Sequence, residues 1–112
     1  MYSNEIETIE QADDLIKNNI ALLFYFYNDN CAPCLSLRPK VVELVCDKYP
    51  KIKIMFINSE QHPEIAAHYN SFNNPTIIIF FDHKEHRRVS KYVGIPQLSE
   101  EIRKPYFLLF NE

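Results

Sequence analysis

The run from Ile20 to Tyr27 limits most strongly what this chain can fold into. It consists of eight apolar and aromatic residues and is bounded by Asn28, Asp29 and Asn30. Because the run is continuous rather than alternating, it is typical of a central β-strand that is covered on both faces. A bilayer-spanning helix needs about 18 or more such residues, so we expect no membrane span.

Before this strand, the sequence predicts one short helix. Thr8 followed by Gln11 matches a capping box, and apolar residues then recur at helical spacing until Asn18 and Asn19. A weak strand around Ile6 precedes the helix.

After the strand, helical and strand patterns alternate to the end of the chain. Pro33 can occupy the first turn of a helix that runs to Tyr49-Pro50 and that Pro39 should kink. The remaining expected elements are a buried strand over Ile52–Ile57, a helix from Pro63 through Tyr69 with Asn70 as its cap, a strand over Thr76–Phe81, a hairpin loop over Asp82–Glu85, a strand over Arg87–Val93, a helix over Gln97–Lys104 broken at Pro105, and an apolar tail over 105–112.

The order β-α-β-α-β-α-β-β-α predicts an α/β fold. Its central sheet should be mixed, with about five strands and helices on both faces. A length of 112 residues fits one domain spanning 1–112. Gly94 is the only glycine, which excludes glycine-rich phosphate loops.

The charge of the chain and its first residues lead to expectations about its partners and its location. The net charge is −3, and the one basic cluster, Lys84 to Arg88, is interrupted by Glu85, so we expect no nucleic-acid partner. The first residues, Met1 to Glu5, lack a basic start followed by an apolar stretch. We therefore expect no signal peptide and a cytoplasmic location.

The motif Cys31-Ala32-Pro33-Cys34 carries the strongest chemical signal. It lies between the central strand and a helix, at the carboxyl edge of the sheet, where open α/β sheets place their chemistry. Unpaired N–H groups and the helix dipole stabilise a thiolate at a helix N-terminus, so Cys31 should be the nucleophile. Cys34 is one turn further along, close enough to form a disulfide with Cys31 or to resolve a mixed disulfide.

These features together resemble the thioredoxin family, over roughly Ile6 to Arg103. The resemblance is carried by the order of the elements, the Cys31-Ala32-Pro33-Cys34 motif, Pro39 in the following helix, and Asn74-Pro75-Thr76 opening a strand about forty residues later. It implies a thioredoxin fold and a thiol–disulfide oxidoreductase with a redox-active Cys31–Cys34 disulfide.

The resemblance also implies how substrate binds. In the family, the proline at the position of Pro75 is cis and faces the cysteine pair, which places Asn74, Pro75 and Thr76 in a groove for an extended substrate segment. The expected substrates are disulfide-containing proteins, and an external reductase or dithiol would recycle the enzyme without a bound cofactor. The dipeptide between the cysteines resembles that of the reducing members. We expect a monomer or a weak dimer.

Several positions that shape the motif depart from the family pattern. The usual buried carboxylate is replaced by Tyr25, its partner lysine by Phe56, and the tryptophan before the first cysteine by Asn30. Ala32 replaces a glycine within the motif and should change the redox potential modestly. Without a carboxylate to take the proton from Cys34, we expect resolution of the mixed disulfide to be slower, or to rely on water, Tyr25 or the departing thiolate.

Less specific interpretations remain open for the cysteines. The pair could be a structural disulfide in a redox-inert binding module, or could ligate a metal or an iron–sulfur cluster. Zinc would need two more ligands, and His62 and His68 only loosely match ligand spacing, so we expect no metal. Cys46 is expected to be a small, semi-buried filler, with a regulatory or intermolecular disulfide as its alternative. Tyr25 is expected to be a core aromatic residue rather than a proton donor.

Overall fold

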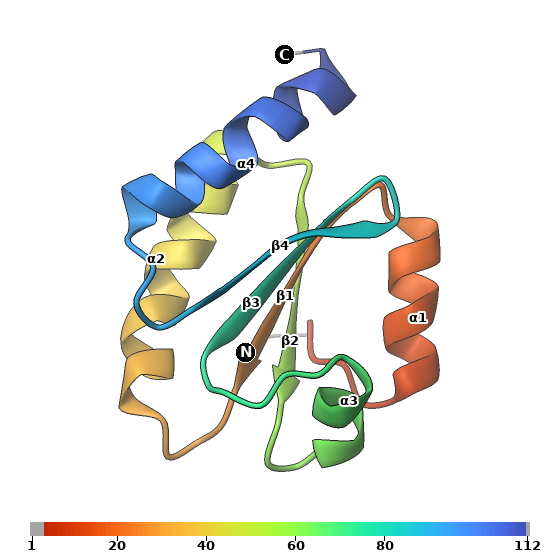
Figure 1. The fold of residues 1–112 in the computed structure, drawn as a ribbon, viewed down its shortest axis with the longest axis vertical. Helices are drawn as coiled ribbons and strands as arrows, with labels where there is room; N and C mark the ends of the chain where they lie inside the picture. Colours follow the sequence, from red (N-terminus) through yellow and green to blue (C-terminus); the bar gives the residue numbers. More distant parts are fainter. Residues whose placement is uncertain (1–3, 112) are drawn as a thin grey trace.

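The apolar run forms β1 (Ala21–Tyr27), the strand around which the other elements are arranged. The computed structural model describes residues 4–111. β1 pairs in parallel with β2 (Lys53–Asn58) and antiparallel with β3 (Thr76–Phe81), and β4 (Lys84–Ser90) completes a sheet of order β2-β1-β3-β4 (Figure 1). Six of the seven residues of β1 are buried. The expected mixed central sheet is confirmed.

Helices cover both faces of this sheet. Within residues 4–111 they are α1 (Ile9–Asn18), α2 (Ala32–Lys48), α3 (Pro63–His68) and α4 (Ile95–Phe110). Successive side chains of a strand point to opposite faces. Leu23 and Tyr25 therefore join the core beneath α2 and α4, whereas Phe24 and Phe26 join the core beneath α1 and α3 (Figure 1).

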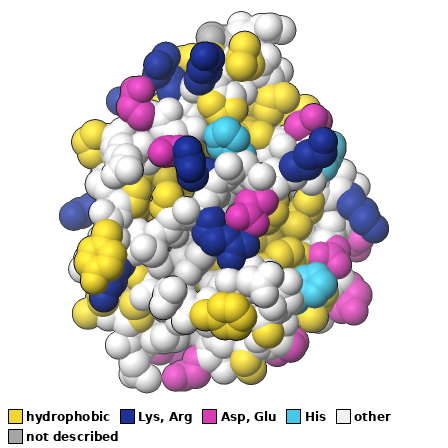
Figure 2. All heavy atoms as spheres, in the orientation of Figure 1, with side chains coloured by type: hydrophobic (Ala, Val, Ile, Leu, Met, Phe, Trp, Pro, Cys, Tyr) yellow, Lys and Arg dark blue, Asp and Glu magenta, His cyan; other side chains and the backbone are white. Residues whose placement is uncertain are grey.

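Two observations concern the length of the helices and the charges on the surface. Among residues 4–111, no helix is long and apolar enough to cross a membrane. Figure 2 shows that acidic and basic side chains are interspersed on the face in view, without one large patch of a single sign.

The expected weak strand around Ile6 is represented within residues 4–111 by a bridge alone. In the described chain, Glu5 makes a single isolated bridge to Phe56, and the sheet has four strands rather than about five. Two backbone hydrogen bonds surround the bridge: Ile6 N–H donates to the Phe56 carbonyl (2.8 Å), and Phe56 N–H donates to the Asn4 carbonyl (2.7 Å). The chain reaches the helix cap at Thr8 too soon afterwards to extend this pairing.

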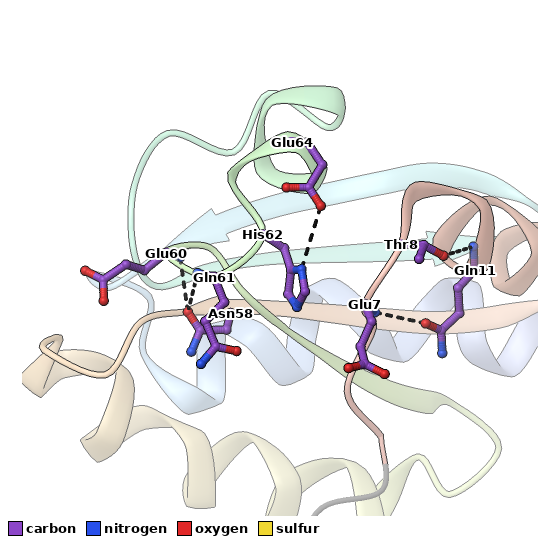
Figure 3. A network of polar contacts seen from close by, with 8 residues as sticks. All are labelled: Glu7, Thr8, Gln11, Asn58, Glu60, Gln61, His62 and Glu64. Carbon is purple, nitrogen blue, oxygen red and sulfur yellow. Dashed lines mark hydrogen bonds and ion pairs between the residues drawn. The ribbon is translucent and has the colours of Figure 1, made fainter.

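The predicted cap at Thr8 is confirmed, whereas the side chain of Gln11 bonds one residue before the cap, at Glu7, rather than at Thr8 itself. The Thr8 hydroxyl oxygen accepts a hydrogen bond from the Gln11 N–H (3.0 Å), and the Gln11 side-chain oxygen accepts one from the Glu7 N–H (2.9 Å) (Figure 3). The first bond satisfies an N–H of the first helical turn, which the helix itself leaves without a partner, and the second fixes the chain just before the cap.

Asn58 organises the connection between β2 and α3. Its side-chain oxygen accepts hydrogen bonds from the N–H groups of Glu60 (3.1 Å) and Gln61 (3.2 Å), which close the turn after the strand (Figure 3). At the other end of α3, the cap residue is Tyr69. The expected cap, Asn70, follows it in the left-handed conformation, with φ 56°.

The hairpin between β3 and β4 is tighter than expected. Its turn consists of Asp82 and His83, with φ 55° and 67°, and Phe81 already pairs with Lys84. The expected loop over Asp82–Glu85 and the expected strand over Arg87–Val93 are therefore wrong by about three residues. A two-residue turn with two positive φ angles is usually signalled by glycine, and this turn contains none.

α4 does not break at Pro105, so this expectation is also wrong. The helix continues to Phe110, and the expected apolar tail is its last part. Tyr106 is fully buried; its ring lies 5.1 Å from that of Tyr49, and its hydroxyl accepts a hydrogen bond from the Lys51 N–H (3.2 Å). This packing stabilises the turn in which proline removes one backbone bond. Pro39 likewise lies inside α2 without ending it.

Cys46 is exposed rather than semi-buried. The preceding residue, Val45, takes the buried position on α2. One further residue rotates the chain about 100° around a helix, which carries Cys46 away from the core.

The packing of α4 predicts unequal effects of two substitutions beyond Pro105. Tyr106→Ala should lower the free energy of unfolding by about 3–5 kcal/mol, because it empties a filled core position. Leu108→Ala removes a side chain that is 72% exposed and should change it by less than about 0.5 kcal/mol. Urea unfolding measures both values. Equally small effects would mean that the end of the helix is not docked.

Candidate active site

The candidate site lies at the edge of the sheet where β1 ends and β3 begins. Because these strands are antiparallel, Phe26 near the end of β1 pairs with Thr76 at the start of β3. The chain then leaves β1 toward α2, while Asn74-Pro75 leads directly into β3 (Figure 1). The cysteine motif and Asn74-Pro75 therefore share one edge.

Cys31 and Cys34 form a disulfide, with their Cα atoms 5.2 Å apart. Cys31 is the N-cap of α2, and its sulfur accepts a hydrogen bond from the Cys34 N–H (3.2 Å). Cys31 is half-buried, whereas Cys34 is only 1% exposed. An N–H directed at the outer sulfur also stabilises a thiolate there after reduction.

The loop before the motif is shaped by Asn28. Its side-chain oxygen accepts a hydrogen bond from the Asn30 N–H (2.9 Å), and its carbonyl accepts one from the Cys31 N–H (3.4 Å). Asn30, the residue expected to shape the motif, is exposed. Ala32 and Pro33 form the exposed first turn of α2, where the N–H that proline lacks has no helical acceptor.

Tyr25 lies beneath the motif as a core aromatic residue. Its hydroxyl donates a hydrogen bond to the Cys34 carbonyl (2.7 Å), and its ring lies 5.7 Å from that of Phe56. Burial raises the pKa of Tyr25 from 10.0 to about 12, an effect that the charge of Arg38 partly offsets. The hydroxyl is therefore protonated at neutral pH and already has an acceptor, so it is poorly suited to take a proton from Cys34.

The segment before β3 has the backbone that the family resemblance implies. The Asn74–Pro75 peptide bond is cis. The Ser59 hydroxyl donates a hydrogen bond to the Asn74 side-chain oxygen (3.1 Å), and the Thr76 hydroxyl donates to the Asn73 carbonyl. These bonds hold the segment at the sheet edge.

A cavity of about 250 Å³ lies beside Cys34. It is lined by β1, α2, the N-terminal segment and the loop after β1, through Glu5, Tyr27, Asp29, Cys34, Leu35 and Arg38. Glu5 and Arg38 were not among the expected site residues. One signal could have pointed to Arg38: it follows Cys34 by four residues, a spacing that places both on one face of a helix.

Arg38 and Glu5 form a small polar cluster at this cavity. The Arg38 guanidinium lies over the ring of Phe56 (3.8 Å from the centroid) and near that of Tyr27 (4.9 Å). An Arg38 nitrogen is 3.6 Å from Oε2 of Glu5, and the Tyr27 hydroxyl donates a hydrogen bond to the same oxygen (2.8 Å). Burial raises the pKa of Tyr27, and the bond to Glu5 raises it further.

The histidines considered as metal ligands have other neighbours. His62 lies 3.7 Å from a carboxylate oxygen of Glu64 (Figure 3), and His68 lies 3.4 Å from one of Asp13. Across residues 4–111, histidine, cysteine and carboxylate side chains form no group of three or more that could hold a metal ion.

A cysteine pair at a helix N-terminus and a cis-proline at the same edge of a mixed sheet form the arrangement of a thioredoxin-fold protein. The sequence model described as Thioredoxin matches residues 4–104. The chain belongs to the thioredoxin family. With its cysteine pair joined as a disulfide, it is a thiol–disulfide oxidoreductase, which acts on disulfide substrates together with a reductant.

Individual relatives agree with this assignment. The chain is 35% identical to a thioredoxin of Pyropia yezoensis over 94 residues, covering 84% of this chain and 85% of the relative. It is 25% identical to the thioredoxin-like protein YdfQ of Bacillus subtilis over 107 residues, covering 96% and 95%. The structure of Fasciola hepatica thioredoxin superposes with a TM-score of 0.78 at 27% identity, covering 88% of this chain and 95% of that one.

The buried hydroxyl of Tyr25 predicts a pH-dependent contribution to stability. At neutral pH, Tyr25→Phe should lower the free energy of unfolding by about 1 kcal/mol, because it removes one hydrogen bond. The pKa of Tyr25 is about 12 in the folded chain and 10.0 ordinarily. The unfolded state therefore ionises first, and the stabilisation is lost as pH rises through this range. Urea unfolding from neutral pH upward should show the variant and the wild type converging; a constant difference would contradict the role of the hydroxyl.

Proposed function

We propose that this oxidoreductase works mainly as a protein-disulfide reductase, with Cys31 as nucleophile and Cys34 as resolving cysteine. The observation that carries the proposal is the unequal setting of the two sulfurs. Cys31 is half-buried at the helix N-terminus and accepts an N–H, whereas Cys34 is almost fully buried. A substrate sulfur can approach Cys31 from solvent, and Cys34 can then attack Cys31 from inside.

The substrate segment is proposed to lie along Asn74, Pro75 and Thr76. The support is their position: Thr76 begins β3 beside the end of β1, and the hydrogen bonds of Asn74 and Thr76 hold this backbone in place. Ala32 and Pro33 would shape the exposed turn that faces the substrate.

The reaction needs an external partner to restore the dithiol. The substrates are proposed to be disulfide-containing proteins, and the electrons to come from a reductase or a small dithiol, without a cofactor bound to the chain. We further propose that the chain acts in the cytoplasm as one domain spanning 1–112, as a monomer or a weak dimer, and without a nucleic-acid or membrane partner. Interspersed surface charges support the last point (Figure 2).

Three cysteine variants test the assignment of roles. In insulin disulfide reduction, Cys31→Ser should abolish turnover, and Cys34→Ser should stop after one event and accumulate a mixed disulfide with substrate, visible by mass spectrometry. Cys46→Ser is the matched control, because Cys46 is exposed on α2, and it should keep wild-type turnover.

Equilibrium titration in thiol buffers tests the direction of the reaction. A reducing enzyme should have a potential near that of thioredoxin itself, for which the reference value is about −270 mV. A pair that resists reduction and shows no turnover would instead identify a binding module with a structural disulfide.

A further inference from the structure

Resolution of the mixed disulfide requires a proton acceptor near Cys34. The attacking species is the thiolate, and a cysteine of ordinary pKa, about 8.5, is only about 3% thiolate at pH 7. Tyr25 on β1 is protonated, and its hydroxyl donates to the Cys34 carbonyl. The position occupied by a carboxylate in the family therefore supplies no acceptor here.

The cavity beside Cys34 offers a carboxylate from a different element. Glu5 belongs to the N-terminal segment that bridges to β2, and its side chain is 33% exposed. Glu5 and Cys34 line the same cavity of about 250 Å³. One water needs roughly 10–15 Å³ of such space and at least two polar partners, so this cavity has room for a short water chain between the two groups.

The carboxylate of Glu5 is held in place from two sides. The Tyr27 hydroxyl donates to Oε2, and the Arg38 guanidinium lies 3.6 Å from the same oxygen. Among the polar contacts of Glu5 with other described residues, both use Oε2, which leaves Oε1 to take up a proton. Arg38 is itself fixed by stacking on Phe56. Tyr27 and Arg38 thus act as positioning residues.

We propose that Glu5 accepts the proton of Cys34, through water in the shared cavity, when Cys34 resolves the mixed disulfide. This inference rests on the proposed function. The Cys34 S–H proton passes to Glu5, and the electron pair of the resulting thiolate forms the bond to the Cys31 sulfur. The bond between Cys31 and the substrate sulfur breaks, and the substrate leaves as a thiolate that takes its proton from solvent. The cysteine pair is oxidised by two electrons, and the substrate disulfide is reduced.

Other charged and titratable groups at this place are few. In the described chain, the cavity also exposes Tyr27 from β1, Asp29 from the loop after β1, and Arg38 from α2. Asp29 is the competing carboxylate. It is exposed, and its Oδ2 lies 3.5 Å from the Asn58 amide nitrogen. β2 contributes only the ring of Phe56, beneath Arg38.

The test separates the two chemical steps in a single turnover. The reduced protein, carrying Cys46→Ser so that the exposed thiol does not react, is mixed with dithionitrobenzoate in a stopped-flow instrument. Attack by Cys31 releases the first thionitrobenzoate, and attack by Cys34 releases the second. Glu5→Gln should leave the first phase unchanged and slow the second about tenfold at pH 7.

The pH profile distinguishes proton transfer from a structural effect. At high pH the thiol ionises without help, so the second-phase rates of Glu5→Gln and the wild type should converge as the pH rises. Glu5→Asp keeps a carboxylate and should recover part of the lost rate. Glu7→Gln is the matched control: the same change two residues along, at an exposed side chain, should alter neither phase. If Glu5→Gln does not fold, Tyr27→Phe, which frees the carboxylate from one support, should show a smaller loss with the same convergence.

Three results would overturn the inference while leaving the proposed function standing. These are a second phase of wild-type rate in Glu5→Gln, a loss that is constant at all pH values, and a tenfold loss in Asp29→Asn instead. Absence of a first phase that depends on Cys31 would instead refute the proposed function, and the inference with it.

Discussion

The burial of β1 on both faces is the constraint on which the rest of this structure depends. A strand with apolar side chains on each side must receive a layer of helices above and below, and neighbouring strands on both edges. β2 and β3 pair with its two edges. α2 and α4 cover one face, and α1 and α3 cover the other. Because the chain leaves this rigid strand directly into α2, the position of the Cys31 N-cap follows from the position of β1. The reactive sulfur is therefore positioned by a strand that is buried along almost its whole length.

The site differs from the family pattern in the position of its charged side chains. Tyr25 and Phe56 make the space beneath the motif aromatic, and the hydroxyl of Tyr25 is satisfied by the Cys34 carbonyl. A buried ion pair is costly to desolvate, so a neutral aromatic pair is a reasonable replacement. The charged groups lie instead at the cavity, where Arg38 is 14% and Glu5 33% exposed. Partial hydration reduces the cost of desolvation and keeps both groups near the inner sulfur.

The features that could be predicted from sequence are those that depend on residues close together in the chain. The central strand, the helix cap at Thr8 and the motif at Cys31 each depend on residues within a few positions of one another. Pro105 shows the limit of such patterns, because its helix is maintained by contacts of Tyr106 with Tyr49 and Lys51, more than fifty residues away. Glu5 could not be predicted as a site residue for the same reason. Nothing near it in sequence indicates that a β-bridge to Phe56 places it at the cavity beside Cys34.

In this chain, which has a single glycine, residues other than glycine adopt the left-handed backbone conformation at several turns. Asn70, Asp82, His83 and Asn111 adopt positive φ angles, each at some cost in backbone energy that glycine would not incur. Glycine, however, gives an unfolded chain more conformations to lose on folding. Residues other than glycine lower the conformational entropy of the unfolded chain. This effect stabilises the folded state relative to the unfolded one and offsets part of the backbone strain. Ala32 extends this to the motif: when the disulfide opens, a turn without glycine has fewer backbone conformations, so the dithiol stays closer to the geometry in which Cys34 can reach Cys31.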